Sequence, residues 1–337
     1  MNRPMIYATT TLLVAGLLAS CGSGDDEREL TADGLEPLKV ACAPAAEHIP
    51  RQLAITEGFN ETNGVEPTCV DVPSGPAQAA ALLSGDLDIA FLTQANIAPL
   101  LDQKQDLVVV GSIRNNLYFD LIVKEGFDLP SEDQGWKGVM EDLEGARIGV
   151  VARGAAAEVI ARALFKAAGI DPEKQTYIAT GLPNTTLAAL TADTIDAAIT
   201  LEPGITLALE QGIAKQPFSL QEGTGPDDFV YDDQLMLTSR EFAETNKDVL
   251  CSYRQAWDEG LEFMRDSDNS QVVEDVAAEL LGLPAESVTA LLERTSSFYP
   301  ETTALDADSV EPGFAFLAEE GASQAAYELD DISVEVC

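Results

Sequence analysis

The feature that most constrains the fold of this chain is an internal repeat. The stretch ALLSGDLDIAFL at 81–92 resembles ALTADTIDAAIT at 189–200, and Asp88 matches Asp196 at an offset of 108 residues. With 337 residues, the chain has room for two domains or for one large domain built from two lobes. Both aspartates stand just before an apolar run, which is typical of turn residues rather than of catalytic acids.

Each copy of the repeat shows the same order of predicted elements. A strand at 38–44 or 146–152 is followed by a helix, a second strand, a second helix and a third strand. Lys39 in the first copy matches Arg147 in the second at the same offset of 108 residues. Near-continuous apolar strands that alternate with helices are typical of a mostly parallel sheet covered by helices. The repeat therefore predicts a duplicated α/β lobe.

The two copies do not fill the chain. Two further extended segments are placed to cross between the lobes, and roughly the last hundred residues have helical spacing. We expect an α/β fold of two lobes, with the C-terminal helices packed on lobe one. The expected division is a signal peptide at 1–20, a flexible tether at 21–37, lobe one at 38–117 plus 235–337, lobe two at 125–228, and hinge crossovers at 118–124 and 229–234.

The N-terminus has the pattern of an export signal. Arg3 supplies a basic start, an apolar run follows, and small residues lead to Cys21. The sequence Leu-Ala-Ser-Cys that ends at Cys21 resembles the lipobox of bacterial lipoproteins, which implies cleavage before Cys21 and a diacylglycerol on its sulfur. The alternative is an ordinary secretory peptide with a chance cysteine. The small and charged residues that follow predict a flexible tether.

Four further cysteines predict two disulfides in an exported protein. Of three connectivities we favour Cys42–Cys69, because LKVACAP and EPTCVDV are predicted to be neighbouring parallel strands. The remaining pair is then Cys251–Cys337, and the alternative is four free, buried thiols. No CxxC motif or Cys/His spacing indicates a metal site, and we expect no cofactor.

The net charge of −39 makes nucleic acid and anionic membrane surfaces poor partners. The acidic residues are spread along the chain and do not form one tail. We therefore interpret them as a solvated exterior that says little about a ligand.

Four segments carry a resemblance to a known family. They are KVACAPAAEHIPRQLAITEGF, VPSGPAQAAALLSGDLDIAFLTQANIAPLL, DLEGARIGVVARGAAAEVIARALFKAAGI and IDAAITLEPGITLALEQG. From about 38 to 300 the chain resembles type II periplasmic substrate-binding proteins of ABC importers, in the nitrate/sulfonate/bicarbonate/taurine branch. The resemblance implies a two-lobed monomer that closes on one small solute. It also implies an ABC permease and ATPase as partners, and a lipid anchor on the outer face of the cytoplasmic membrane.

Two loops of lobe one are candidate ligand contacts. Ser74 and Gly75 end a strand and open a helix, and with Gln78 they form the loop that lines the cleft in the family. Thr93 and Gln94 follow the third strand and offer hydrogen bonds to a solute. The alternatives are a plain helix cap and local loop bonding.

Further candidates lie at the start of the first helix and of the first crossover. His48 is placed near the cleft by the resemblance, and its alternative is an exposed first-turn residue. Arg114 and Asn115 are candidates for an anionic group, with a surface ion pair as the alternative for Arg114. Tyr118 and Phe119 offer stacking on a planar ligand, although core packing is more usual at strand spacing.

Lobe two departs from the family pattern. Sulfonate- and taurine-binding relatives place Ser or Thr at the helix N-terminus after its first strand, whereas this chain has Ala-Arg-Gly-Ala-Ala-Ala at 152–157. Arg153 and backbone N–H groups are then the candidates for an anion, and a more apolar or heteroaromatic solute becomes plausible. Glu202 is a candidate for a ligand amine, for a salt bridge across the cleft, or for a helix cap.

These patterns favour a solute receptor that performs no chemistry. An enzyme on the same fold is the second reading, because pyrimidine-forming relatives in thiamine biosynthesis resemble this family. One histidine, no cysteine cluster and an export signal argue against that reading. A ligand-sensing surface lipoprotein without a permease is the third. Within the transport reading we expect a small anion, with a heteroaromatic or aromatic carboxylate solute as the alternative.

Overall fold

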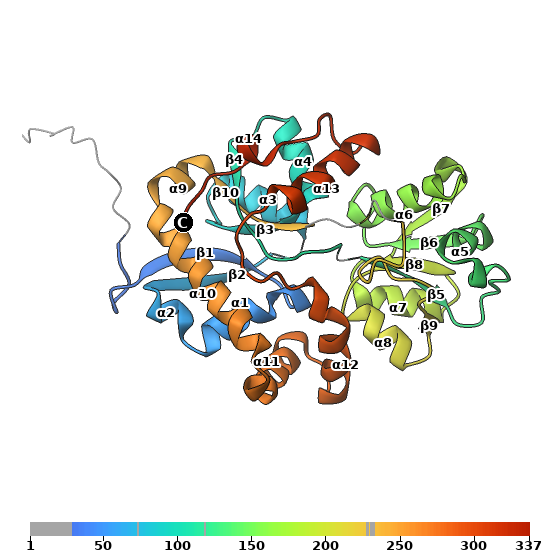
Figure 1. Ribbon diagram of the computed structural model, residues 1–337, viewed down its shortest axis with the longest axis horizontal. Helices are drawn as coiled ribbons and strands as arrows, with labels where there is room; N and C mark the ends of the chain where they lie inside the picture. The colour runs from blue at the N-terminus through green and yellow to red at the C-terminus, as the bar shows by residue number, and fades with distance from the viewer. Residues whose placement is uncertain (1–28, 73, 118, 227–228, 230–232) are drawn as a thin grey trace, which may run out of the picture.

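The computed structural model describes residues 29–72, 74–117, 119–226, 229 and 233–337. Its strands form two separate groups, each with helices on its faces, and Figure 1 shows the two bodies side by side. The chain crosses from the first body to the second and returns, because its last strand pairs with strands from the beginning of the chain.

The first lobe is built on a mixed sheet. Its strands are β1 (Glu36–Cys42), β2 (Val65–Asp71), β3 (Ala90–Thr93), β4 (Leu107–Ser112) and β10 (Gln234–Ser239). β1 and β2 pair in parallel, whereas β10 pairs antiparallel with β3 on one side and with β4 on the other. A parallel bridge between Val40 and Ile89 places β1 next to the β3 side of the sheet. The order across the lobe is therefore β2-β1-β3-β10-β4.

The second lobe repeats this order in one five-stranded sheet. Its strands are β5 (Asp120–Lys124), β6 (Arg147–Val150), β7 (Thr176–Ala179), β8 (Ala197–Thr200) and β9 (Ala214–Lys215). The order is β7-β6-β8-β5-β9, with β6 parallel to β7 and β8, and β5 antiparallel to β8 and β9. Each sheet thus has three parallel strands of one repeat beside an antiparallel strand and a further strand. The duplicated α/β lobe that the repeat predicts is present.

The matched aspartates of the repeat have the same structural role in both lobes. Asp88 accepts a hydrogen bond from the backbone N–H of Lys39 at 2.7 Å, and Asp196 accepts one from the N–H of Arg147 at 2.8 Å. The backbone N–H of each aspartate donates to the carbonyl of the same partner. Each carboxylate therefore fixes the start of its first strand to the turn before the third, as the turn interpretation predicts.

Helices cover both sheets. Those of the first lobe are α1 (Ile49–Thr56), α2 (Phe59–Thr62), α3 (Gly75–Ser84), α4 (Gln94–Asp102), α9 (Arg240–Thr245), α10 (Lys247–Arg265), α11 (Ser270–Leu281), α12 (Ala285–Thr295), α13 (Ala307–Glu319) and α14 (Leu329–Ile332). Those of the second lobe are α5 (Trp136–Asp142), α6 (Ala156–Ala167), α7 (Pro183–Thr191) and α8 (Gly204–Glu210). Short 3-10 turns include η1 (Ala46–His48) and η6 (Ser296–Phe298). α10 packs along α1, and α13 packs on α4.

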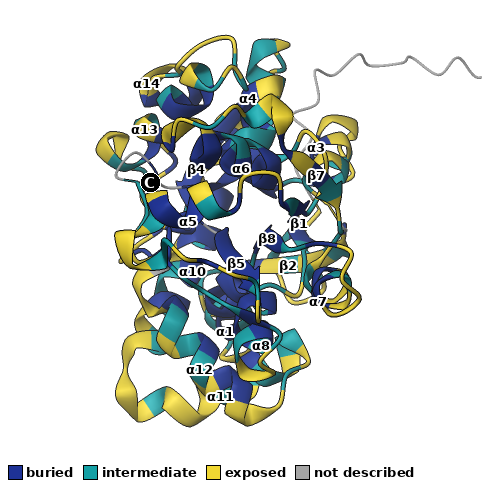
Figure 2. Ribbon diagram, turned by 90° about the vertical axis from the view of Figure 1, so that its right-hand side faces the viewer, coloured by how far each residue is buried: buried dark blue, intermediate teal, exposed yellow. Residues whose placement is uncertain are grey.

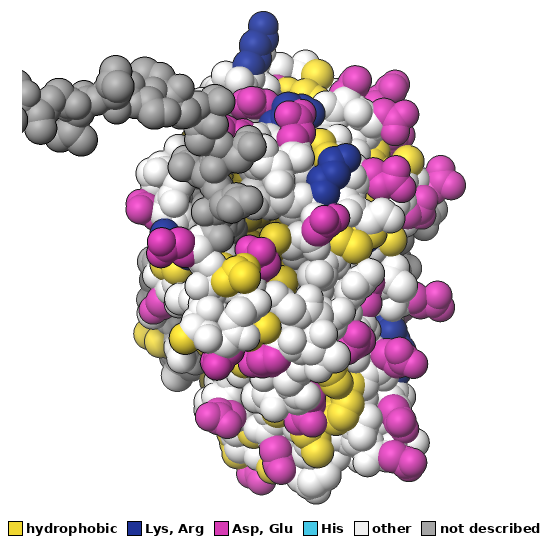
Figure 3. Space-filling view, turned by 90° about the vertical axis from the view of Figure 1, so that its left-hand side faces the viewer, with side chains coloured by type: hydrophobic (Ala, Val, Ile, Leu, Met, Phe, Trp, Pro, Cys, Tyr) yellow, Lys and Arg dark blue, Asp and Glu magenta, His cyan; other side chains and the backbone are white. Residues whose placement is uncertain are grey.

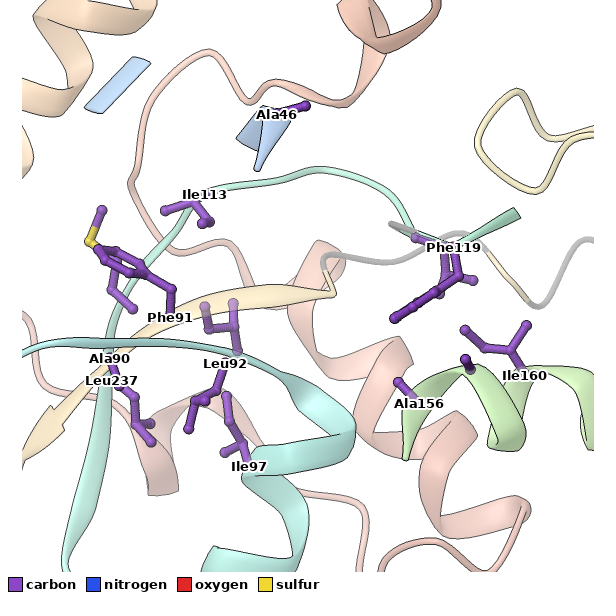
Figure 4. Packing of buried hydrophobic residues seen from close by; sticks show 14 of the residues in the cluster. Ala46, Ala90, Phe91, Leu92, Ile97, Ile113, Phe119, Ala156, Ile160 and Leu237 are labelled. Carbon is purple, nitrogen blue, oxygen red and sulfur yellow. The ribbon is translucent and has the colours of Figure 1, made fainter. Parts of the chain in front are cut away.

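Buried apolar side chains continue from one lobe into the other. Figure 2 shows buried residues along the strands and the inner helix faces, with exposed residues at the outer ends. In the connection between the lobes, Phe119 is 6% exposed and lies against Ala156 and Ile160 of α6 (Figure 4). Phe119 is therefore a core residue here, whereas Tyr118 lies outside the described residues.

The first crossover lies earlier in the chain than the sequence pattern predicts. The pattern places 118–124 in a hinge, but Asp120–Lys124 forms β5 and pairs with β8 and β9 inside the second sheet. The reason is that this extended run is almost fully buried between two strands. The connection from β4 to β5 is therefore 113–119, and the return connection lies between β9 and β10.

Two disulfides join distant parts of the first lobe. Cys42 and Cys69 are bonded across the parallel strands β1 and β2, with a Cα–Cα distance of 5.3 Å. Cys251 of α10 is bonded to the last residue, Cys337, with a Cα–Cα distance of 5.1 Å. Both pairings are the ones favoured from the sequence.

The export signal and the lipid site lie outside the described residues. The predicted signal peptide at 1–20 and Cys21 therefore stay predictions. In the part of the chain that the structure describes, no helix has both the length and the apolar character needed to cross a membrane. Figure 3 shows acidic side chains scattered over the face of the first lobe that points away from the second.

Candidate functional site

The candidate site lies where the two sheets turn the same edge toward each other. The first crossover leaves β4 after Ser112 and reaches β5 at Asp120, which pairs with Thr200, the last residue of β8. The second crossover enters β10 at Gln234, which pairs with Thr93, the last residue of β3. Both connections thus join the carboxyl ends of the parallel strands in the two lobes. Seven extended residues span at most about 25 Å, so the two edges lie near each other, where open α/β sheets bind ligands.

The first-lobe edge brings together hydroxyl and amide side chains. Ser74 is exposed and caps α3 by accepting a hydrogen bond from the N–H of Ala77 at 3.4 Å. Asn96 of α4 donates to the hydroxyl oxygen of Thr93 at 2.9 Å. Gly75 leaves room for this amide, since a Cβ at Gly75 would lie 2.4 Å from the Asn96 nitrogen. Asn96 was not a sequence candidate, although it follows Thr93 at the N-terminal turn of a helix.

Two glutamines predicted at this edge point into the lobe instead. Gln78 is buried, and its side-chain oxygen accepts a hydrogen bond from the N–H of Phe91 in β3 at 3.0 Å. Gln94 is fully buried and donates to the carbonyl of Val310 in α13 at 2.8 Å. These bonds hold β3 and the C-terminal region in place, so both glutamines are structural residues here. The prediction that they contact a solute is not supported by their geometry.

His48 is buried, contrary to its alternative as an exposed first-turn residue. It is 2% exposed and packs edge-on against Phe91 and Trp257, with ring centroids 5.0 and 6.0 Å away. Burial, with the nearby charges of Arg51 and Arg114, lowers the pKa of His48 well below its usual value. The imidazole is therefore neutral at pH 7 and lies beneath the edge rather than at its surface.

Arg114 joins the two crossovers. Its guanidinium is fully buried and lies 2.9 Å from the carboxylate of Asp233 and 3.2 Å from the amide oxygen of Gln234. It also donates to the carbonyl of Asn116 at 2.9 Å. Neither a solute contact nor a surface ion pair describes this residue. Asn115 beside it is exposed, and its amide lies 3.5 Å from the carbonyl of Tyr299.

Asp120 joins the crossovers at their second-lobe ends. It is fully buried and accepts hydrogen bonds from the Ser219 hydroxyl, from the Gln216 amide at 2.6 Å and from the N–H of Leu220 at 2.8 Å. Burial raises the pKa of Asp120 to about 7, while the hydrogen bonds from Ser219 and Leu220 and the charge of Arg294 oppose the rise. The sequence shows no signal for this role, because its partners lie about 100 residues away.

Arg153 at the second-lobe edge has its charge paired. Its guanidinium contacts both carboxylate oxygens of Glu158 at 2.7 and 2.9 Å and donates to the carbonyl of Tyr177 at 3.0 Å. Glu158 also accepts the backbone N–H of Gly154, the residue before the N-cap of α6, at 2.7 Å. A solute would have to compete with Glu158 for this arginine.

Glu202 combines two of its predicted alternatives. One carboxylate oxygen accepts the N–H of Thr206 at 3.0 Å and caps α8, and the other lies 3.1 Å from the Nε of Arg294 in α12. Glu202 is fully buried, and this burial raises its pKa above the usual value. It is therefore a helix cap and a salt-bridge partner, and it does not face a ligand amine in this structure.

An apolar side chain is exposed at the second-lobe edge. Leu182, at the position that matches Ser74 in the repeat, occupies the N-cap position of α7 without a side-chain hydrogen bond and is 58% exposed. Pro183 packs against Gly204, where a Cβ would lie 2.7 Å from the proline ring. In the repeat, Pro183 matches Gly75 and Gly204 matches Asn96. The same two positions therefore touch in both lobes, but the glycine is on α3 in the first lobe and on α8 in the second. An exposed leucine thus takes the place in the second lobe that the Ser74 hydroxyl has in the first.

Two cavities lie away from this edge. One of about 350 Å³ is lined by α10, α11 and α12, and one of about 530 Å³ lies beside the acidic face of α10. Neither is lined by residues at the carboxyl ends of the parallel strands. We place the site by strand topology, because both crossovers converge there.

The arrangement defines a class of protein with two similar α/β lobes, joined by two crossovers, whose carboxyl edges face each other. Solved structures share it. The aliphatic sulphonate-binding protein SsuA of Escherichia coli matches with a TM-score of 0.70 at 18% identity, over 88% of this chain and 97% of that one. The alkanesulfonate-binding protein SsuA of Xanthomonas axonopodis pv. citri, bound to MOPS, matches with a TM-score of 0.71 at 18% identity, over 89% and 98%.

The nitrate-binding protein NrtA of Synechocystis PCC 6803 matches with a TM-score of 0.68 at 13% identity, over 89% of this chain and 86% of that one. These likenesses show that the chain has the periplasmic-binding-protein fold. The model of the family described as NMT1/THI5 like matches residues 45–270, about two thirds of the chain. The chain therefore belongs to the NMT1/THI5-like family. No curated protein sequence matches it.

Proposed function

We propose that this protein is an extracytoplasmic solute-binding protein that delivers a small oxyanion to an ABC importer. The observation that carries the proposal is the pair of facing edges, each bearing the N-termini of helices after parallel strands. Free N–H groups and the helix dipole favour a negative group at such positions. Membership of the family and likeness to sulfonate- and nitrate-binding proteins support the same function.

Neutral donors bind the anion in this proposal. Arg114 and Arg153 already pair with Asp233 and Glu158, so neither offers an unpaired charge. The hydroxyl oxygens of Ser74 and Thr93 accept local hydrogen bonds, which leaves their O–H hydrogens to donate to a solute. Backbone N–H groups at the start of α3 and α4 would complete the set.

A solute with an apolar or heteroaromatic part is the second candidate. The observation that favours it is the second-lobe edge, where Leu182 is exposed and Ala155 takes the place of a hydroxyl residue. An inorganic ion would leave this apolar surface unused, whereas an organic sulfonate or aromatic carboxylate would cover it.

The cellular setting completes the proposal. The leader and Cys21 support export and a lipid anchor on the outer face of the cytoplasmic membrane. The protein would act as a monomer, pass its solute to a permease driven by an ATPase, and carry out no chemical step. A sensor lipoprotein without a permease has the same binding site, and the presence of transporter genes beside this one would separate the two.

A thermal-shift panel on the purified protein tests the binding function. It contains sulfonates, taurine, nitrate, bicarbonate, aromatic carboxylates and pyrimidines of the thiamine-precursor type. A solute at 100 times its Kd stabilises the folded state by about 2.7 kcal/mol. Ser74→Ala with Asn96→Ala should abolish the shift, and Ser84→Ala at the other end of α3 is the matched control. A solute that binds the double variant as tightly as the natural protein would remove this edge from the site.

A further inference from the structure

Two consecutive helices near the C-terminus together touch both lobes. α11 packs on α1 of the first lobe, whereas α12, the next helix, packs on α8 of the second lobe. Figures 1 and 2 show α11, α12 and α8 grouped at the same end of the molecule. The helices α11 and α12 therefore form a third connection between the lobes, in addition to the two crossovers. Contacts between α12 and α8 resist separation of the lobes.

Polar contacts join α12 to α8 at both of their ends. Ser287 at the start of α12 donates to Glu210 at the end of α8 at 2.6 Å. Arg294 near the end of α12 lies 3.1 Å from Glu202, which stands before Pro203, the N-cap residue of α8. The two helices thus run in opposite directions with one contact at each end. A relative shift of the lobes has to break both contacts.

Arg294 bonds to two acceptors. Its Nε pairs with the Glu202 carboxylate, while its Nη2 donates to the amide oxygen of Gln216 at 2.7 Å. The guanidinium is 22% exposed and the carboxylate is fully buried. A buried carboxylate that loses its cation is strongly disfavoured, so the second lobe cannot move away from Arg294 without a cost.

The contacts of Arg294 lead directly to the hinge and to the candidate site. Gln216 lies in the return crossover and donates to Asp120, the first residue of β5, at 2.6 Å. Glu202 follows β8 and caps α8, so it lies in the loop at the carboxyl edge of the second sheet. Arg294 therefore contacts the loop after β8, at the edge that would face a solute. Through Gln216 it is also linked to the start of β5, the strand that follows the first crossover.

We propose that Arg294 is a positioning residue for solute binding, which holds the second lobe and its edge loop in the arrangement that closes on the solute. The inference rests on the proposed binding function, because closure of two lobes on a solute is what Arg294 would assist. Its planar guanidinium reaches two acceptors at once, which a lysine ammonium on a flexible stem does not reproduce in the same geometry.

The test compares Arg294→Gln and Arg294→Lys with the natural protein by small-angle X-ray scattering and by titration with any solute from the panel. Arg294→Gln should increase the radius of gyration both with and without solute. It should also weaken binding by about tenfold to a hundredfold, the size of one or two charge-assisted hydrogen bonds. Arg294→Lys should have a radius of gyration and an affinity between those of the natural protein and of Arg294→Gln. Arg240→Gln, which removes an exposed pair with Asp106 inside the first lobe, should change neither quantity.

Each outcome decides the proposal. An unchanged radius of gyration and unchanged affinity in Arg294→Gln would overturn it, and so would tighter binding. If Arg294→Gln does not fold by circular dichroism, Ser287→Ala replaces it and should also open the lobes. If no solute binds the natural protein, the proposed function fails, while the scattering comparison without solute still decides whether Arg294 holds the lobes together.

Discussion

The guanidinium of Arg114 lies 2.9 Å from the carboxylate of Asp233, and both side chains are buried where the two crossovers meet the first lobe. Arg114 leaves the lobe in one connection and Asp233 returns in the other. The pair therefore fixes how the two connections emerge together. At the far ends of the same connections Asp120 plays the corresponding role for the second lobe.

We predict that Arg114→Met lowers the free energy of unfolding by about 3–5 kcal/mol, because Asp233 is left as a buried, uncompensated charge. The double change Arg114→Met with Asp233→Leu should cost clearly less than the sum of the single changes. Urea denaturation of the four proteins measures the difference. Additive single costs would show that the two residues do not act as a pair.

We predict a pH dependence of stability that arises from Asp120. Its pKa rises to about 7 in the folded protein from a value near 3.8. The stability that this raised pKa contributes is full below pH 3.8 and is lost as the pH rises through 7. The natural protein should therefore lose stability relative to Asp120→Asn between pH 4.5 and 7.5, by at most about 1.4 kcal/mol per pH unit.

Urea unfolding at four pH values measures this difference. Asp106→Asn, which changes an exposed carboxylate, is the control and should not reproduce the trend. A stability difference between the natural protein and Asp120→Asn that is constant across the range would contradict the assignment.

We predict that the two disulfides stabilise the fold to different extents. The Cys42–Cys69 bridge closes 27 residues and the Cys251–Cys337 bridge closes 86. In the loop-entropy model these correspond to about 3.6 and about 4.6 kcal/mol. Paired serine variants, studied by urea denaturation, should rank in that order. Alkylation with mass mapping of the folded natural protein should find none of these four thiols free, and a stoichiometric free Cys42 or Cys69 would disprove the first bridge.

We predict unequal effects from Gly75 and Gly204, the small residues of the corresponding helix contacts in the two lobes. Gly75→Ala meets the Asn96 amide, which can rotate away, so it should cost less than about 1 kcal/mol of stability while displacing a candidate ligand contact. Gly204→Ala meets the rigid ring of Pro183 and should cost about 1–3 kcal/mol. Thermal unfolding of both variants tests which one loses more stability. Equal losses would mean that Pro183 moves aside as easily as the Asn96 amide.

Local patterns in the sequence predict most of the fold. The offset that relates Asp88 to Asp196 predicts two similar lobes, and in both lobes the aspartate accepts the backbone N–H of the matching residue 49 positions earlier in its own repeat. The strand pattern around Cys42 and Cys69 likewise predicts their pairing, since parallel neighbours bring the two Cα atoms within bonding distance.

The roles of the individual site candidates were decided only by tertiary structure. Ser74 and Thr93 lie at the predicted edge, because a helix N-terminus after a strand is a local feature. Gln78 and Gln94 belong to the same loops, yet they turn inward because Phe91 and Val310 offer them backbone partners there.

The charged candidates show the same limit most clearly. Arg114 and Glu202 read as candidates to contact a solute, but each is neutralised by a residue about 90 to 120 positions away, Asp233 and Arg294 respectively. A sequence read locally shows which residues carry charge and where strands and helices begin. Whether a charge is available to a ligand depends on which distant charge the folded chain brings beside it, because a buried ion must be paired before it can bind anything else.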